Sequence, residues 1–198
     1  MTILPCAYFP SVAYFAALLR GDAVIDLGEH YIKRSERNRA VILTAAGEMQ
    51  LTAQVRRANR PRQPMQSIEL DYSKRWQKQH WGALVAAYKA SPFFDHYAPF
   101  IEPFFQREYR TLVELNMAVL QTLCTLLGVA MPTVSESYIT AREGDFDLRP
   151  KQKGPTFVAD PYIQVFDEVF HPDLSILDLL FNAGPDAIAV VRRCRFEY

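Results

Sequence analysis

The sequence has few of the residues that mark metal centres, cofactor loops or disulfide frameworks. Its three cysteines, Cys6, Cys124 and Cys194, stand singly in apolar surroundings, so neither a disulfide framework nor a cysteine metal site is indicated. It also lacks a Gly-rich phosphate loop, Gly-x-Ser-x-Gly, His-x-x-x-His and Cys-x-x-Cys. We therefore predict no metal site, and the sequence names no cofactor.

Net charge and long apolar runs are lacking as well. Lys and Arg together number 22, as do Asp and Glu, so no overall bias toward nucleic acid exists and we predict no nucleic-acid partner. Residues 3–19 are almost wholly apolar, but Pro5, Pro10 and Ser11 interrupt the run and Arg20 ends it. No basic segment precedes it, unlike in a secretory signal. We expect a soluble cytoplasmic protein with no membrane span.

The charges that are present are sorted along the chain. Residues 33–78 hold eleven Lys or Arg against four acids, whereas residues 135–178 hold nine acids against four bases. Two interpretations stay open: two solvated faces that attract each other, or a local site for an anion. With 198 residues and a hydrophobic content of 49%, the chain suits one globular domain.

The first 27 residues predict a strand–helix–strand unit. Residues 2–8 and 23–27 are apolar runs typical of buried strands, and the usual crossover makes them parallel. Ser11 is a suitable N-cap for a helix over 11–20, and Gly21 suits the left-handed position after it. Such a unit places a helix N-terminus beside the carboxyl end of a strand, where α/β proteins tend to hold anions.

The remaining patterns predict an α/β fold with a small mixed sheet. Its β-α-β opening (1–71) packs against a helical half (72–130), and a loop-rich C-terminal part (131–198) completes the single domain. The expected elements are a hairpin of 38–44 and 49–55 with its turn at 46–48, a loop over 56–65, a strand at 67–70, helices over 73–90, 93–101 and 104–128, a loop over 142–163, and a helix from a Ser175–Asp178 capping box to Gly184.

A basic segment after the second strand supplies candidate binding residues. Lys33, Arg37 and Arg39 can make charge-assisted contacts to phosphate, and in a strand Arg37 and Arg39 would share one face. The alternative is an exposed edge strand guarded by charge. Asparagine is disfavoured in β structure, so of the residues in this segment Asn38 is the one that packing explains least easily. His30, at the carboxyl side of the second strand (23–27), is a candidate general base or a surface histidine.

Three further positions carry a functional and a structural interpretation. Asp26 ends the second strand, where an acid could bind a ribose or metal or could cap the chain. Ser11 lies at the helix N-terminus that could face an anion. His80 lies on an inward helix face with aromatic rings, which favours the core but leaves a binding role open.

Several segments resemble the WbqC-like proteins, in order and over nearly the whole chain. The stretch between Arg56 and Gln66 shows no shared pattern. The matching segments are Tyr8-Phe9-Pro10-Ser11-Val12-Ala13-Tyr14-Phe15, Glu29-His30-Tyr31-Ile32-Lys33, Arg37-Asn38-Arg39, His80-Trp81, Ala87-Tyr88, Ser91-Pro92-Phe93-Phe94, Leu115-Asn116, Leu174 to Asn182, and Gly184-Pro185.

The resemblance implies a role in bacterial O-antigen or other surface-polysaccharide biosynthesis. By resemblance, the likeliest site is formed by Tyr8, His30, Lys33, Asn38 and Arg39. One hypothesis is a transferase, of acyl or aminoacyl type, that acts on a phosphorylated or nucleotide-linked sugar. The cations would then hold phosphate, His30 would deprotonate the attacking amine, and Tyr8 and Asn38 would orient the sugar. The alternative is a non-catalytic scaffold whose partner surface is the aromatic segment 93–105.

Overall fold

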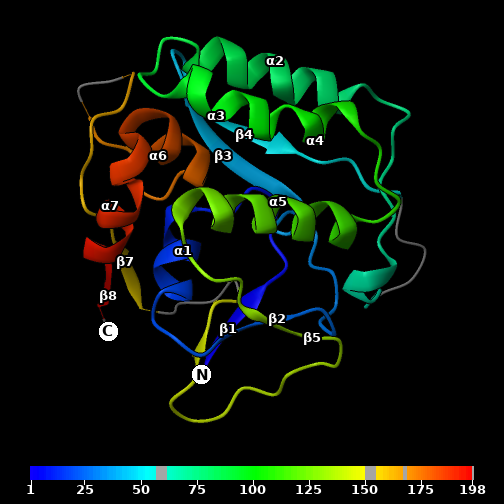
Figure 1. Cartoon of the computed structure of the whole chain (residues 1–198). Helices are drawn as coiled ribbons and strands as arrows, with labels where there is room; N and C mark the ends of the chain where they lie inside the picture. Colours follow the sequence, from blue (N-terminus) through cyan, green and yellow to red (C-terminus); the bar gives the residue numbers. More distant parts are fainter. Residues whose placement is uncertain (57–61, 150–154, 167–168, 198) are drawn as a thin grey trace.

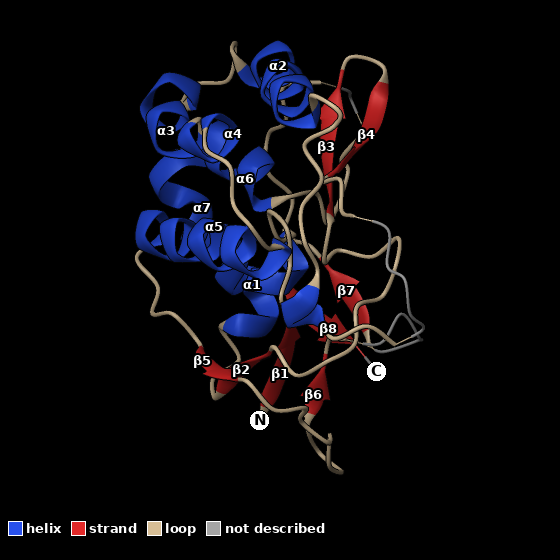
Figure 2. Ribbon diagram, turned by 90° about the vertical axis from the view of Figure 1, so that its right-hand side faces the viewer, coloured by secondary structure: helices blue, strands red, loops and turns tan. Residues whose placement is uncertain are grey.

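A four-stranded parallel sheet lies at one end of the molecule (Figures 1 and 2). The computed structural model describes residues 1–56, 62–149, 155–166 and 169–197. In spatial order the strands are β5 (Thr133–Ser135), β2 (Ala23–Asp26), β1 (Thr2–Pro5) and β6 (Phe146–Asp147). All three pairings are parallel, and an α/β fold is confirmed.

The predicted strand–helix–strand opening is confirmed. Helix α1 (Val12–Leu18) joins β1 to β2, and the two strands pair in parallel from Thr2 opposite Ala23 to Pro5 opposite Asp26. Ser11 caps α1 by accepting the Tyr14 N–H at 3.3 Å. Gly21 has a φ of +96°, so the chain can turn back into β2 without a side-chain clash.

The hairpin forms a separate two-stranded sheet beneath the upper helices, so the expected mixed sheet divides into a parallel and an antiparallel part (Figure 1). Its strands are β3 (Arg39–Thr44) and β4 (Gly47–Thr52). The turn comes one residue earlier than predicted, because Gly47 already pairs with Thr44. The Thr44 hydroxyl stabilises this turn by donating to the Gly47 carbonyl at 2.8 Å.

The helical half contains α2 (Trp76–Tyr88), α3 (Phe94–Ile101), α4 (Pro103–Gln106) and α5 (Leu112–Leu127). The single helix predicted over 104–128 is wrong, because the chain is extended at Arg107 and restarts at Thr111. Thr111 and Glu114 form a capping box, which satisfies N–H groups at the start of α5 and makes a new helix favourable there. Helix α5 lies between the parallel sheet and α2–α4 (Figures 1 and 2).

The C-terminal part holds α6 (Ile176–Ala183), the 3-10 turn η2 (Gly184–Asp186), α7 (Ala187–Arg193) and an antiparallel pair of β7 (Thr156–Val158) with β8 (Arg195–Glu197). The prediction of a loop over 142–163 missed β6 and β7, and residues 150–154 of it lie outside the described residues. The predicted strand at 67–70 is a 3-10 turn, η1 (Met65–Ser67), followed by isolated bridges at Glu69 and Leu70. Of the predicted loop over 56–65, residues 57–61 lie outside the described part.

The Ser175 cap at the start of α6 is confirmed, but its predicted reciprocal partner is not. Ser175 accepts the Leu177 N–H, whereas Asp178 turns inward and accepts hydrogen bonds from the hydroxyls of Tyr88 and Tyr162 at 3.0 and 2.8 Å. Burial raises the pKa of the Asp178 carboxyl, and these donors oppose the rise. Asp178 therefore ties α6 to α2 instead of closing a local capping box.

The core is continuous from the parallel sheet through α1 and α5 to the aromatic residues of α2–α4. Cys6 and Cys124 are buried free thiols, and Cys194 is a half-buried one. Within the described ranges, no helix is both long and apolar enough to cross a membrane.

Candidate functional site

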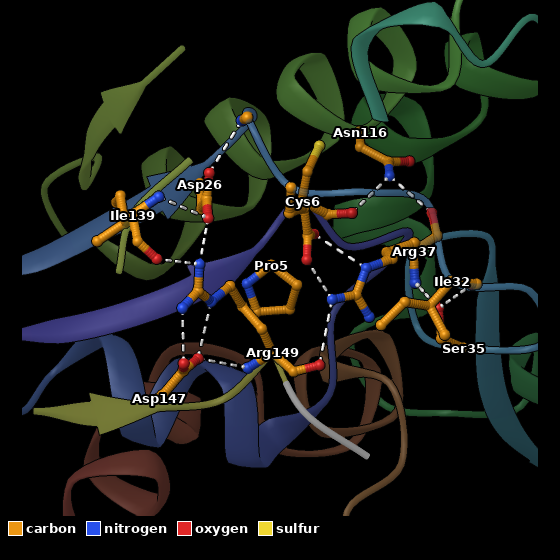
Figure 3. Close-up of polar contacts among 12 residues, drawn as sticks. Pro5, Cys6, Asp26, Ile32, Ser35, Arg37, Asn116, Ile139, Asp147 and Arg149 are labelled. Atoms are coloured by element: carbon orange, nitrogen blue, oxygen red, sulfur yellow. Dashed lines mark hydrogen bonds and ion pairs between the residues drawn. The ribbon is translucent and has the colours of Figure 1, made fainter. Parts of the chain in front are cut away.

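A network of buried ion pairs closes the carboxyl edge of the parallel sheet (Figure 3). Asp26 ends β2 and Asp147 ends β6, and the guanidinium of Arg149 lies between them. Arg149 pairs with the Asp26 carboxylate and donates to the two carboxylate oxygens of Asp147 at 2.9 and 2.7 Å. Asp26 also accepts the N–H groups of Gly28 and Ile139. Asp26 therefore holds the sheet edge together.

A second buried pair joins Glu29 to Arg37. The Arg37 Nε donates to Glu29 at 2.9 Å, and a terminal nitrogen of Arg37 pairs with the other carboxylate oxygen. The same terminal nitrogen donates to the Arg149 carbonyl at 3.1 Å (Figure 3). Burial raises the pKa of Glu29, and the Arg37 contact opposes that rise. Arg37 precedes β3, so the predicted common face with Arg39 is not formed. Its charge is neutralised inside the protein.

Three cavities adjoin these residues, and the first lies at the carboxyl edge of the sheet. This carboxyl-edge cavity has a volume of about 380 Å³. Most of its lining residues follow β2 or β5 or lie at the end of β6, and Arg62 precedes η1. The lining residues are Glu29, His30, Ile32, Arg62, Tyr138, Asp147 and Arg149. Along the chain, β2 and β5 are added on one side of β1, and β6 is then added on its other side. Open α/β sheets bind ligands in the crevice beyond the carboxyl ends of the strands at such a reversal. The structure thus places exposed His30 at the edge expected for a ligand site.

The second cavity, here called the basic cavity, has a volume of about 400 Å³. It brings together three of the predicted site residues, Lys33, Asn38 and Arg39, although these lie in an irregular segment and at the start of β3. Its lining residues are Tyr31, Lys33, Arg34, Asn38, Arg39, Val55, Arg56 and Asp71. Among the described lining residues, four cations accompany one carboxylate, so this part of the cavity has the charge to attract an anion.

The third cavity, the Glu36 cavity, has a volume of about 220 Å³ and shares Arg34 and Arg39 with the basic cavity. Ser11, Glu36, Asp173 and Ser175 line it. It adjoins the start of α1, where the sequence led us to expect an anion. The Asp173 carboxylate already accepts the Ala13 N–H at 2.8 Å, and Ser11 accepts that of Tyr14. The protein's own oxygens therefore occupy the helix N-terminus.

The carboxyl of Glu36 is expected to make stability depend on pH. Burial raises its pKa from 4.5 to about 7; Arg37 opposes the rise, and Asp173 and Glu29 add to it. The folded protein therefore holds a proton that the unfolded chain has lost, and between these values the free energy of unfolding falls as pH rises. Glu36→Gln removes this cost, so the variant should gain up to about 3 kcal/mol over wild type near pH 8 and much less near pH 5.

Urea unfolding of both proteins across this pH range measures the difference. Glu143→Gln is the matched control, since the Glu143 side chain is exposed. A gain for Glu36→Gln that does not vary with pH would show that the carboxyl does not titrate in this range.

The Tyr8 and His80 side chains contact each other, and neither is among the described residues that line the three cavities. The Tyr8 hydroxyl lies 3.0 Å from the His80 Nδ1, and both side chains are buried against Trp76. Burial lowers the pKa of His80 to about 4, so its ring is neutral at neutral pH. The pair has the environment of a hydrogen-bonded core contact.

Several residues at these sites were not singled out by the sequence. Glu29 belongs to one of the segments that resemble the WbqC-like proteins and precedes His30. Only the three-dimensional structure shows that it pairs with Arg37. Arg149 and Asp147 fall in the segment predicted as a loop, and no local pattern signals their contact with Asp26. Within the described part of the chain, no group of three or more His, Cys, Asp or Glu could hold a metal ion.

Comparison with known proteins gives one family and one curated relative. Over 98% of both chains, the sequence is 28% identical to an uncharacterized protein of Mycobacterium tuberculosis, Rv1507c. No solved structure shows significant similarity to the present chain. The model of the WbqC-like protein family matches residues 6–153, which include β2 to β6, the buried ion pairs and most residues around the three cavities. The chain therefore belongs to the WbqC-like protein family.

Proposed function

We propose that this protein binds a phosphorylated sugar precursor of bacterial surface polysaccharide and acts on it as a transferase. Family membership points to a role related to polysaccharide biosynthesis. The observation that carries the proposal is the basic cavity. Its described lining residues include the cations Lys33, Arg34, Arg39 and Arg56 and, as the one carboxylate among them, Asp71. Its volume of about 400 Å³ is in the range of small-molecule sites.

The phosphate would lie against Arg39 and Arg56. Arg39 is the first residue of β3, so the sheet fixes its backbone. Arg56 follows β4, and its backbone N–H donates to the Glu69 carbonyl at 2.9 Å. Arg56 also pairs with Glu69 at 2.9 Å, but both side chains of that pair are largely exposed and such pairs are weak. A phosphate can therefore compete for this guanidinium at little cost.

The sugar would extend from the phosphate toward the carboxyl-edge cavity. Tyr31 and Lys33 line the basic cavity, whereas His30 and Ile32 line the carboxyl-edge cavity, so one short segment borders both. The role of His30 as the base that deprotonates an attacking amine stays a prediction, as does the acyl or aminoacyl nature of the transfer.

Ligand binding tests this function directly. We expect glucose 1-phosphate and UDP-glucose to bind wild type in isothermal titration calorimetry, and Arg39→Ala to weaken binding about tenfold or more through loss of a charge-assisted contact. Arg192→Ala, which removes an exposed cation at the end of α7, is the control and should bind like wild type. The proposal fails if neither compound binds, or if Arg39→Ala binds both as tightly as wild type.

The second candidate function is that of a non-catalytic scaffold. Its partner surface would differ from the aromatic segment 93–105 that the sequence suggests. In the aromatic segment 93–105, Phe94, Phe104 and Phe105 are buried, and Phe100 is the large hydrophobic residue of the segment that is strongly exposed, at 50%. Most of the rings expected to form a partner face are therefore turned into the core. Ile163 and Val169 instead expose 90% and 70% of their surface between β7 and α6. A double substitution of these two by serine should abolish co-purification with glycosyltransferases if the protein is a scaffold, and leave sugar-phosphate binding unchanged.

A further inference from the structure

The Asn38 side chain is held in one orientation by Ala53. Its Nδ2 donates to the Ala53 carbonyl at 3.0 Å, its own carbonyl accepts the Ala53 N–H at 2.9 Å, and its N–H donates to Ser35 at 3.2 Å. A backbone carbonyl requires a donor, so the amide nitrogen must face Ala53 and Oδ1 must face away from it. The side chain cannot turn over without losing this bond.

The oxygen so fixed has no hydrogen-bond partner among the residues that the structure describes. Asn38 is only 5% exposed and lines the basic cavity, so bulk water does not solvate Oδ1 freely. Buried polar atoms are nearly always paired in native proteins, and an unpaired one calls for an explanation. The neighbouring Arg39 Nε is likewise buried and without a partner in the described part.

Asn38 and Arg39 both line the basic cavity, and these adjacent residues carry a complementary pair of unpaired atoms, an acceptor and a donor. The Arg39 guanidinium suits an anionic oxygen, as does the positive charge around it. Oδ1 suits the opposite group, an O–H or N–H of the ligand. A bare phosphate or a simple alkyl phosphate carries no such donor at neutral pH beyond its own residual proton, and would leave Oδ1 unpaired.

We propose that the basic cavity selects a phosphate ester that carries its own hydroxyl or amine donor close to the phosphate, and that Asn38 Oδ1 accepts that donor. This inference rests on the proposed function, because it assumes that the phosphate lies in the basic cavity. Asn38 is then a specificity-determining residue, and the class of substrate narrows to hydroxylated or aminated phosphate esters such as sugar phosphates. A hydroxyl and an amine satisfy Oδ1 by the same chemistry.

A series of small esters separates the two donors and isolates the contact. Ethyl phosphate, 2-hydroxyethyl phosphate and 2-aminoethyl phosphate share one phosphate and differ in the donor, and glucose 1-phosphate adds a full ring. Calorimetric titration of wild type should give at least about tenfold tighter binding for one donor-bearing ester than for ethyl phosphate. The tighter of the two small donor esters identifies the hydroxyl or the amine as the partner.

A variant tests whether Asn38 causes this preference. Asn38→Ala should bring the best donor-bearing ester down to the affinity of ethyl phosphate, while ethyl phosphate binding itself stays within about threefold of wild type. Asn182→Ala is the control, since Asn182 lies on α6 and donates to Asp178. Circular dichroism checks the fold of each variant. If Asn38→Ala does not fold, the ester series on wild type still shows whether the cavity prefers a donor-bearing ester.

The outcomes separate this inference from the function it rests on. If wild type binds ethyl phosphate as tightly as every donor-bearing ester, Oδ1 is satisfied by an ordered water and the inference is overturned, while phosphate binding stands. An unchanged preference in a folded Asn38→Ala variant also overturns it. If no phosphate ester binds, the proposed function falls as well.

Discussion

Replacing Arg37 with alanine is expected to lower the free energy of unfolding by about 3–5 kcal/mol, because it leaves the Glu29 carboxylate buried without its cation. Arg37 and Glu29 expose only 1% and 3% of their surface, so water cannot replace the lost partner. The substitution also removes the donor to the Arg149 carbonyl, which connects the basic segment to the end of β6. Urea unfolding followed by circular dichroism measures the loss.

An exposed arginine pair in the same protein gives the matched control. Arg110 pairs with Glu114 on the surface, with side-chain exposures of 78% and 48%. Arg110→Ala should therefore cost less than about 1 kcal/mol. Similar losses for the two alanine variants would mean that the Glu29–Arg37 pair is solvated in solution, and the described network at the sheet edge would be wrong.

Gly28→Ala is expected to destabilise the protein by about 2–4 kcal/mol, because no space exists for a methyl group there. A Cβ on Gly28 would lie 2.0 Å from the Tyr138 backbone nitrogen and 2.2 Å from the Ser137 carbonyl carbon. These are backbone atoms, so relief requires the segment after β5 to move away from β2. That movement would also weaken the hydrogen bond from the Ile139 N–H to Asp26 and displace Tyr138 from Arg149.

The same substitution at Gly82 should have the opposite sign. Gly82 lies inside α2, and a Cβ there would meet no atom within 4 Å. Alanine in an exposed helix interior is favoured over glycine, so Gly82→Ala should raise stability by about 0.5–1 kcal/mol. Thermal unfolding of the two variants side by side compares them under identical conditions. A neutral Gly28→Ala would show that the two segments do not touch as described.

Together the two predictions concern one structure, the closed carboxyl edge of the sheet. The Asp26–Arg149 pair joins segments that are far apart in the chain, and the contact between Gly28 and Tyr138 packs such segments closely. The Glu29–Arg37 pair closes the segment between β2 and β3. The Glu29–Arg37 pair flanks the segment 30–33, which borders the basic and carboxyl-edge cavities. We expect it to hold the candidate binding residues in place, as preorganised sites require.

The sequence by itself determined the elements whose signals are local. Continuous apolar runs gave the parallel pair β1 and β2, and Ser11 and Ser175 began α1 and α6, because N-cap hydrogen bonds span only two or three residues. Gly128, with a φ of +65°, ended α5 where expected. The grouping of Lys33, Asn38 and Arg39 also followed from closeness in the chain.

Tertiary structure alone decided which of the charged residues are free to meet a ligand. Arg37 and Arg39 look equivalent in the sequence, but Arg37 is turned inward to Glu29 and Arg39 lines two cavities. Arg149 contacts Asp26 across 123 positions, a distance over which no periodicity carries information. Such pairs form only when separate strands of one sheet bring their ends together, since burial then makes an unpaired charge costly. Local sequence patterns determine those helices and strands of this protein that have local signals. Packing between distant segments determines which charged side chains are buried in pairs and which line a cavity.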